Sequence, residues 1–220
     1  MLSYLSGTTT NYWDGGAWTT TESWAPTTGG TTWSRSAPPA DNFPSQIRYY
    51  VKSRAEDNVG LKQQTNNTIS FVYDVTAPTS AVTLPVASGF YGPNKMLPTI
   101  SGTSNDPYTV TGASVAYRDM SYNTTYWQKP GWNEPIRWYP CEQYSGSWST
   151  WTVTGSTIPV FSDGKDYRVY VRALDTVGNI ETEKYNQFRW DETVPVSSAV
   201  GACRRVDIRY GRHQLDPRHL

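Results

Sequence analysis

The stretch "YRVYVRALDTVGN", residues 167–179, has an alternating pattern that decides the predicted fold. Apolar or aromatic side chains occupy every second position of its first part, namely Tyr167, Val169, Val171 and Ala173. A period of two residues is that of a β-strand with one buried face. Gly178 and Asn179 follow, and both residue types tolerate the positive φ of a tight turn. The stretch therefore predicts a strand that ends in a sharp return.

An earlier part of the chain repeats this pattern. Residues 57–82 match residues 175–200, and corresponding positions lie 117 to 118 residues apart. A repeat of that spacing has the size of a domain, so the sequence predicts two copies of one fold. The paired positions to which we assign structural roles are Tyr49 with Tyr167, Asp57 with Asp175, and Gly60 with Gly178.

The spacing of the repeat falls to 114 residues towards the N-terminus. Trp33 still corresponds to Trp151, but Trp18 corresponds to Trp132. The second copy therefore carries about four extra residues, which we place in "CEQYSGSWS". Insertions concentrate in loops, so the sequence predicts a loop there with Cys141 inside it.

The first copy is shorter than the second at its beginning. At a spacing of 114, residue 1 corresponds to residue 115, so the first copy lacks a counterpart of residues 81–114. We expect that segment to hold the first two strands of the domain. The predicted divisions are a partial Ig-like repeat at 1–79, a complete one at 80–200, and a divergent, disordered tail at 201–220. We interpret the chain as a fragment of a longer repeat array.

The tail differs sharply in composition from the repeats. It reads "GACRRVDIRYGRHQLDPRHL", holds both histidines of the chain and contains no Ser, Thr, Trp or Lys. We interpret it as a frame-shifted or otherwise foreign end rather than a basic functional tail. The two cysteines, Cys141 and Cys203, do not occupy equivalent repeat positions. A disulfide of the repeat would recur in both copies, so we predict two unpaired thiols.

Composition narrows the class of protein. Charged residues make up 17% of the 220 residues and the net charge is zero, which argues against a nucleic-acid partner. No apolar run approaches the roughly 18 residues of a membrane helix, so we predict no membrane insertion. The start, "MLSYLSGTTTNYW", has neither the basic nor the apolar region of a signal peptide. With 10 Trp, 16 Tyr, 17 Gly and 15 Pro, the chain has the composition of an all-β protein with many turns.

Further short alternating segments support that fold class. Val115 and Tyr117 alternate in "SVAYRDM", Phe188 and Trp190 alternate in "NQFRWDE", and Pro85 ends the short strand "AVTLP". Short strands separated by turn signals are typical of β-sandwiches. We predict an all-β fold of tandem Ig-like β-sandwich domains, the first truncated at its N-terminus. In such sandwiches a tyrosine at the start of a late strand closes a corner by hydrogen bonding to backbone upstream, and we expect this of Tyr49 and Tyr167.

Two motifs carry a resemblance to a known family. The strand and turn follow "Y-x-V-x-x-R-A-x-D-x-x-G-N", and the segment 74–78, "DVTAP", follows "D-x-T-A-P". The chain resembles the tandem Ig-like, fibronectin-type-III-like repeats of large bacterial surface proteins of the adhesin type. The resemblance implies a non-catalytic spacer or stalk outside the cell, at the cell surface. Its implied partners are neighbouring repeats of the same chain and cell-surface glycans or proteins. The first copy departs from the motif at Leu61, where the second has Asn179.

No catalytic constellation is present in the repeats. Both histidines lie in the tail, which excludes a Ser-His-Asp triad in the repeats and argues against a histidine-based metal site. The acidic residues that recur lie at turns and linkers, whereas paired-acid hydrolysis needs two carboxyl groups in one cleft. We therefore predict that the chain is not an enzyme.

The tryptophans raise an alternative function. Exposed aromatic rings can stack on sugar faces, so a carbohydrate-binding module is the alternative to a spacer. Its candidate residues are Trp148, Trp138 and Trp132, and Trp148, found only in the second copy, is expected to be the most exposed. The competing interpretation is that the tryptophans fill the core, because scaffold positions must recur in every copy.

A calcium site at the linker is the remaining candidate; no other cofactor is predicted. Asp74 lies where one repeat ends and the next begins, and Asp106 is a second candidate ligand. Calcium prefers six to eight oxygen ligands, and the family resemblance suggests calcium at such linkers. The alternative is that Asp74 bonds backbone amides in a turn and that Pro78 alone stiffens the linker.

Overall fold

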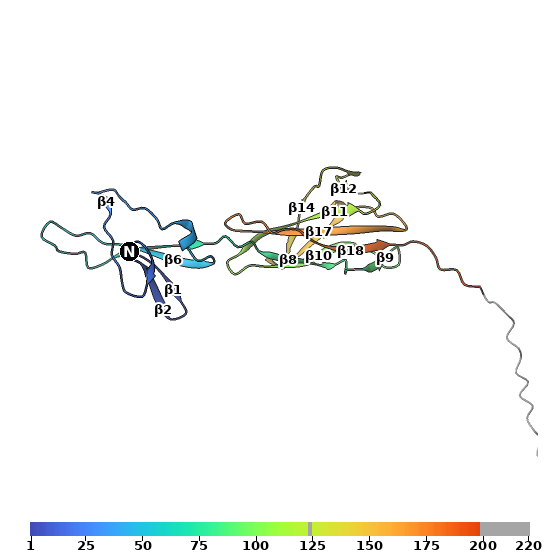
Figure 1. The fold of residues 1–220 in the computed structure, drawn as a ribbon. Helices are drawn as coiled ribbons and strands as arrows, with labels where there is room; N and C mark the ends of the chain where they lie inside the picture. The colour runs from blue at the N-terminus through green and yellow to red at the C-terminus, as the bar shows by residue number, and fades with distance from the viewer. Residues whose placement is uncertain (123–124, 199–220) are drawn as a thin grey trace, which may run out of the picture.

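The computed structural model describes residues 1–122 and 125–198 and confirms an all-β fold. The described residues form 18 strands and two short 3₁₀ turns, Ala40–Asn42 and Gly155–Thr157. Figure 1 shows two groups of strands end to end along the long axis of the molecule. We call residues 1–73 the first unit and residues 79–190 the second unit; residues 74–78 link them.

The second unit is a sandwich of two sheets. Its smaller sheet runs in the order β15 (Glu142–Tyr144), β16 (Ser147–Thr154), β10 (Thr99–Asn105) and β8 (Thr79–Leu84). Its larger sheet runs β13 (Trp132–Asn133), β12 (Tyr126–Trp127), β11 (Val110–Asp119), β17 (Lys165–Asp175), β18 (Lys184–Trp190) and β9 (Gly89–Tyr91). β14 (Tyr139–Pro140) also pairs with β11. Neighbouring strands are antiparallel except β9, which runs parallel to β18.

The alternation predicted for the strand at 167–175 is confirmed. Tyr167, Val169, Val171 and Ala173 are all buried on the inner face of β17. Trp151 of the opposite sheet lies in the same core, fully buried, and its indole nitrogen donates a hydrogen bond to the Thr103 carbonyl oxygen at 3.1 Å. The core of the second unit therefore forms between the two sheets, as in other β-sandwiches.

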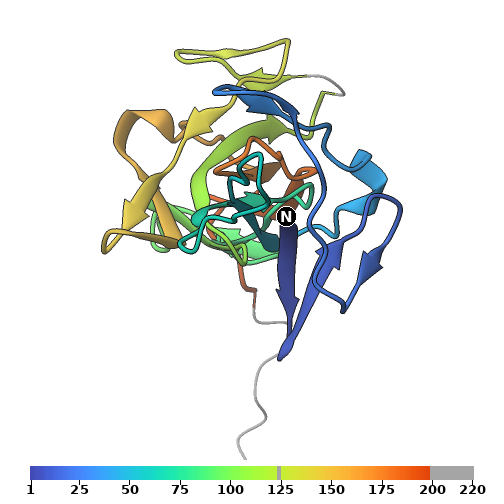
Figure 2. The ribbon, with the colours of Figure 1, turned by 90° about the vertical axis from the view of Figure 1, so that its left-hand side faces the viewer.

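The first unit is built differently. It has one five-stranded sheet, β3 (Trp18–Thr19), β2 (Thr9–Trp13), β1 (Leu2–Ser6), β6 (Ile47–Ser53) and β7 (Asn67–Tyr73). A separate hairpin consists of β4 (Thr28–Gly29) and β5 (Trp33–Ser34). The described residues of the first unit include no counterpart of the second unit's β8, β9 and β10. Figure 2 views the molecule from the first-unit end, with the second unit behind.

Strand pairing repeats where the sequence repeats. Trp13 lies opposite Trp18 as Trp127 lies opposite Trp132. In the same way, the pair Tyr49 and Phe71 corresponds to the pair Tyr167 and Phe188. The repeat found in the sequence therefore extends to the register of the hydrogen-bonded strands. The division into independently folding domains at residue 79/80 stays a prediction.

Both corner tyrosines hydrogen bond to backbone five residues upstream. The Tyr49 hydroxyl donates to the Pro44 carbonyl oxygen at 2.9 Å. The Tyr167 hydroxyl accepts a hydrogen bond from the Ser162 backbone N–H at 2.9 Å. Each bond fixes the loop that leads into the long strand, although the direction of donation differs between the units.

The segment at 81–114 holds more than the two strands expected. It contains most of β8, all of β9 and β10, and the first part of β11. β9 has only three residues, and a strand that short shows no recognisable alternation. Its place is decided by pairing with the distant β18, which no local pattern encodes.

The predicted insertion loop is also corrected. Gly29 pairs with Trp33 in the first unit, and Gln143 pairs with Trp151 in the second. The extra residues therefore lie after Gln143 and lengthen a β-hairpin instead of forming a loop. Cys141 precedes them; it is a free, buried cysteine, and burial raises the pKa of its thiol to about 12. Cys203 and the predicted tail at 201–220 lie outside the described residues.

Candidate cation site at the junction of the two units

Asp74 begins the linker between the units. Its side chain is buried, and Oδ1 accepts hydrogen bonds from the Thr76 backbone N–H at 2.9 Å and the Ser45 hydroxyl at 3.2 Å. The same hydroxyl accepts a hydrogen bond from the Val75 backbone N–H at 3.0 Å. These contacts form the local turn that an aspartate before "VTAP" favours.

Asp106 lies in the loop between β10 and β11. Its Oδ1 accepts hydrogen bonds from the backbone N–H groups of Tyr108 and Thr109, at 2.8 and 3.2 Å. Its Oδ2 is buried from solvent and has no hydrogen-bond partner among the described residues. A buried carboxylate oxygen without a donor is costly, so this atom is the most unusual feature of the junction.

Asp175 lies at the end of β17 and is buried. Its Oδ1 accepts hydrogen bonds from three successive backbone N–H groups, those of Val177, Gly178 and Asn179, at 2.8 to 2.9 Å. Its Oδ2 accepts one from the Asn179 side-chain amide at 2.8 Å. Burial alone would raise the pKa of Asp175, but these hydrogen bonds outweigh it and hold the pKa below its usual value. Asp175 is therefore an anion at neutral pH.

The three aspartates meet. One carboxylate oxygen of each of Asp74, Asp106 and Asp175 lies within 4.8 Å of the others. The ion pairs found among the described residues involve other carboxylates, namely Glu56, Asp119, Asp166 and Glu181. Like charges at this distance repel strongly in a partly buried site, which a bound cation would relieve.

Hydrogen bonds between the units surround the cluster. The Asn179 side-chain amide donates to the carbonyl oxygens of Asp74 and Thr76 in the linker, at 3.2 and 3.3 Å. The Tyr108 hydroxyl donates to the Gln46 carbonyl oxygen of the first unit at 2.8 Å. The linker is therefore tied to the second unit, and the first unit is tied to the loop that carries Asp106.

The two aspartates predicted as calcium ligands, Asp74 and Asp106, lie together in the structure. Asp175 joins them, although its sequence pattern indicates only a structural turn. The pairing of Val110 with Asp175 brings β17 to the loop after β10. Three carboxylates offer a hard cation oxygen ligands, and calcium takes six to eight in all.

The corresponding turn of the first unit keeps the local geometry only. Oδ1 of Asp57 accepts hydrogen bonds from the Val59 and Leu61 backbone N–H groups at 3.0 and 2.9 Å. Gly60 and Gly178 both have positive φ, +86° and +98°, as the turn requires. Leu61, which stands where the second unit has Asn179, is exposed.

The candidate sugar-binding tryptophans are each half-buried. Trp132 stacks on Tyr167 with ring centroids 5.4 Å apart. The Arg172 guanidinium lies over the Trp138 ring, 4.2 Å from its centroid. Trp148, expected to be the most exposed, packs against the edge of the core. The rings of Trp132 and Trp138 therefore already contact the protein's own side chains.

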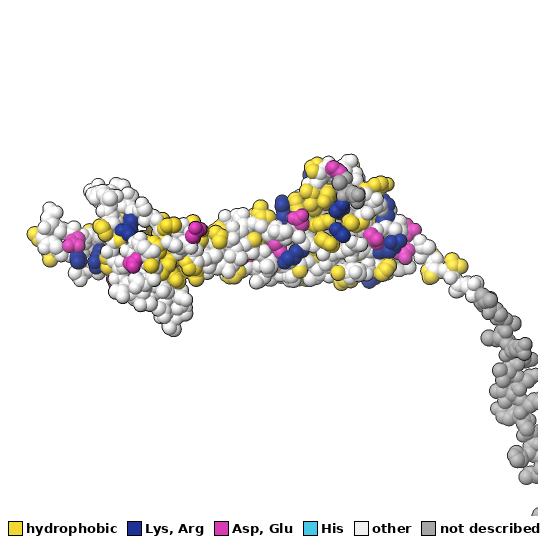
Figure 3. Space-filling model, in the orientation of Figure 1, with side chains coloured by type: hydrophobic (Ala, Val, Ile, Leu, Met, Phe, Trp, Pro, Cys, Tyr) yellow, Lys and Arg dark blue, Asp and Glu magenta, His cyan; other side chains and the backbone are white. Residues whose placement is uncertain are grey.

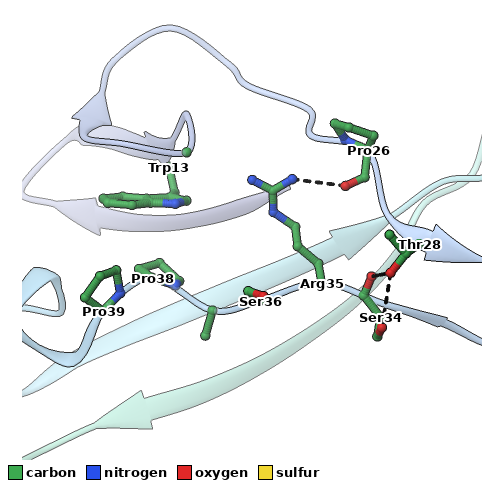
Figure 4. A pocket seen from close by; sticks show the side chains of 10 residues that line it. Trp13, Pro26, Thr28, Ser34, Arg35, Ser36, Pro38 and Pro39 are labelled. Carbon is green, nitrogen blue, oxygen red and sulfur yellow. Dashed lines mark hydrogen bonds between the residues drawn. The ribbon is translucent and has the colours of Figure 1, made fainter.

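A shallow cavity lies in the first unit, away from the junction. Figure 4 shows Arg35 between Trp13 and Pro26, and its guanidinium donates a hydrogen bond to the Pro26 carbonyl oxygen at 3.0 Å. Thr28 and Ser34 face each other across the adjoining hairpin. This contact network holds the β4–β5 hairpin locally. The described residues that line the cavity include no carboxylate or histidine.

Comparison with known proteins finds similarity of fold only. No family model and no curated protein matches this chain. The chain is similar to the FN1–FN3 domains of chicken CNTN1, with 13% sequence identity and a TM-score of 0.31; the match covers 68% of this chain and 46% of that one. It is also similar to the fibronectin(III)-like modules of Clostridium thermocellum CbhA, with 12% identity and a TM-score of 0.30, covering 90% and 83%.

Proposed function

We propose that this chain is a non-catalytic structural repeat, a spacer of a larger extracellular or cell-surface protein. The arrangement of the two units end to end supports this (Figure 1). No helix among the described residues is long and apolar enough to cross a membrane. The neighbouring units of the same chain are the spacer's first partners, and adhesion at a cell surface is the biological setting that we propose for it.

The observation that carries the proposal is the set of hydrogen bonds across the junction. A spacer must hold its units in a fixed direction, and a five-residue linker alone does not ensure this. The Asn179 amide bonds the linker backbone, and the Tyr108 hydroxyl bonds the first unit. Because these bonds join the linker and the first unit to loops of the second unit, they restrict bending between the units.

The test exchanges the residue that differs between the two repeats. The Asn179→Leu variant places in the second unit the residue found at the same position of the first, and Leu61→Asn is the matched control. We expect Asn179→Leu to broaden the distance distribution between spin labels on the two units. Leu61→Asn, in a turn outside the junction, should leave that distribution unchanged. Identical distributions for Asn179→Leu and the parent chain would refute a junction held by this residue.

We also propose that calcium occupies the junction cluster. The buried Asp106 oxygen without a partner and the three converging carboxylates support it. A ligand at 100 times its Kd stabilises a protein by about 2.7 kcal/mol, which corresponds to roughly ten degrees in the melting temperature of a domain of this size. Chelator should lower the melting temperature of the whole chain by that amount, and calcium should restore it.

Neutral variants make the calcium test specific. Asp106→Asn should abolish the calcium response and raise the stability of the calcium-free chain, because it removes one repelling charge. Asp57→Asn, in the equivalent turn of the first unit, should keep the full response. If neither chelator nor calcium changes the melting temperature, the calcium proposal is wrong, and the three aspartates serve only to accept backbone hydrogen bonds in turns.

The carbohydrate-binding alternative has less support from the geometry. Tyr167 stacks on Trp132, and Arg172 covers Trp138. A sugar would have to displace contacts that already contribute to the fold. The spacer is therefore the function that the arrangement favours.

A further inference from the structure

Apolar side chains of the first unit are exposed at positions whose counterparts in the second unit are covered. Trp33 has an exposed fraction of 47%, and Trp151, its counterpart, has 0%. Phe71 is 39% exposed, against 1% for Phe188. Ile69, on the same face as Phe71, is 68% exposed. Figure 3 shows apolar side chains gathered on the surface of the first unit beside the linker.

The second unit shows what covers such a face. Residues 79–105, which form β8, β9 and β10, lie against β16, β17 and β18. A side chain at Gly102 would overlap the Trp151 ring, so this glycine allows the close contact. β9 runs along the outer edge of β18, with Gly89 opposite Phe188. β8 and β10 cover the aromatic rings of the core, and β9 pairs with β18, the last strand of the second unit.

The first unit retains the groups that such a segment would meet. β7, the counterpart of β18, is the outer strand of its sheet. The Gln63 side chain accepts a hydrogen bond from the Ala55 backbone N–H, as Glu181 does from the Ala173 backbone N–H. In the second unit the same Glu181 side chain also bonds the Ser80 backbone N–H on β8, at 2.9 Å.

We infer that the exposed face of the first unit binds a polypeptide segment with the strand pattern of residues 79–105. The bound segment adds one strand along β7 and two strands over Trp33, a mode in which backbone hydrogen bonds give affinity and side-chain pockets give specificity. The partner is an unpaired copy of this segment in another stretch of polypeptide. A second folded copy of the chain does not fit, because its own residues 79–105 are already held in its sandwich.

One contact made by residues 79–105 in the second unit has no counterpart in the first unit. Asn186, the counterpart of Ile69, donates hydrogen bonds to the Val82 and Pro85 carbonyl oxygens, at 3.0 and 2.9 Å. Ile69 has no amide to offer there. The matching backbone carbonyl groups of a bound segment must therefore find water or other donors at that point.

A graft tests the inference within the whole chain. Leu2 lies opposite Val51 as Tyr117 lies opposite Val169, so Met1 corresponds to Ala116, one position later than the sequence spacing of 114 predicts. A copy of residues 79–115 joined directly to Met1 therefore continues β1 in register. With 5-fluorotryptophan labelling, the Trp33 resonance, assigned with Trp33→Phe, should lose its solvent isotope shift in the grafted chain. The same graft with its glycine changed, Gly102→Val in the added copy only, should leave Trp33 exposed.

A second arm tests binding between separate molecules. A fluorescent peptide of residues 79–105 should bind the whole chain saturably with one-to-one stoichiometry, and Phe71→Lys should abolish that binding. An exposed Trp33 in the grafted chain would overturn the inference. So would an ungrafted chain that dimerises in solution with Trp33 protected, because a second copy would then be the occupant. Neither outcome depends on whether the junction is rigid or binds calcium.

Discussion

Trp33 and Trp151 occupy the same position of a repeat, yet one is 47% exposed and the other is fully buried. Both lie in the second strand of a hairpin, paired with the preceding strand in the same way. The difference comes from the neighbouring strands of the same sheet, because β10 and β8 continue the sheet beside β16 in the second unit, whereas the described residues of the first unit include no counterpart of them. Burial of a repeated residue thus depends on strands that lie far from it in the sequence.

Other repeated positions are insensitive to those strands. Tyr49 and Tyr167 are both almost completely buried. Tyr49 is enclosed by the aromatic rings of its own unit, which are Tyr4, Trp18, Phe43 and Phe71. The comparison therefore separates a local aromatic cluster, which each unit builds by itself, from a sandwich core, which needs a second sheet.

The largest expected difference between the units comes from their tryptophans. Trp151→Ala should destabilise the second unit by about 3–5 kcal/mol, because it leaves a cavity in a closed core. Trp33→Ala should cost less than about 1 kcal/mol, since that ring is half exposed. Hydrogen exchange of β17 and β6 reports the two units separately. Equal losses from both substitutions would show that the first unit is closed in solution.

The pattern of the long strand was enough to predict its fold and its buried face. Tyr167, Val169 and Val171 point into the core as the alternation required. The sequence also placed Pro85 just after a strand, and β8 ends at Leu84. Local periodicity and turn residues suffice for such elements because they act between neighbours along the chain.

Features that depend on distant contacts could not be predicted in the same way. Asp175 is 69 positions from Asp106, and only the pairing of β11 with β17 brings it to the cluster. The different exposure of Trp33 and Trp151 is likewise invisible in a repeat that aligns them. One local signal was available: Asn179 replaces Leu61 at a matched position, and Asn179 is the residue that bonds the linker.

Gly102→Ala should produce the next largest effect. A Cβ atom at this position would overlap the Trp151 ring and the Ala81 carbonyl oxygen, so the sheet must shift to admit it. Overpacking of this kind costs about 1–3 kcal/mol. Gly112→Ala is the matched control, because nothing lies within 4 Å of a Cβ atom there. Chemical unfolding measures the free energy of unfolding of both variants. A Gly102→Ala variant as stable as the parent chain would mean that Trp151 has room to move.

Acid should weaken the second unit through a pair that the first unit lacks. The Lys165 Nζ atom lies 2.7 Å from Asp119 Oδ2. In the first unit, the strand register places Ile47 and Tyr4 at the positions of Lys165 and Asp119. Burial alone would raise the pKa of Asp119, but hydrogen bonds from Lys165 and Ser121 outweigh it and lower the pKa below 3.8. The contribution of Asp119 is therefore complete above that pH and is lost as the pH falls through the lowered pKa.

The variant Asp119→Asn isolates this contribution. Hydrogen bonds to charged groups contribute about 1.5–3 kcal/mol, and Lys165 is partly exposed, so a loss of about 1 kcal/mol is expected at pH 7. The difference between the parent chain and Asp119→Asn should shrink as the pH falls below 3.8, the usual aspartate value. The other carboxylates titrate in both proteins, so their contributions to the pH dependence of stability cancel in this difference. A difference that stays constant with pH would show that the pair contributes nothing through its charge.

The smallest expected difference is that between phenylalanine variants of the two corner tyrosines, whose rings are equally buried but whose hydroxyls have opposite roles. Tyr167→Phe leaves the Ser162 N–H without its acceptor, whereas Tyr49→Phe leaves the Pro44 carbonyl without its donor. An unpaired N–H is tolerated less well than an under-satisfied carbonyl, so Tyr167→Phe should cost about 1–1.5 kcal/mol and Tyr49→Phe about 0.5 kcal/mol. Burial raises the pKa of Tyr49 to about 12, so its hydroxyl remains a donor across the neutral range and the comparison can be made at pH 7. A larger loss for Tyr49→Phe would mean that the first unit, without a second sheet, depends more on its corner than the complete sandwich does.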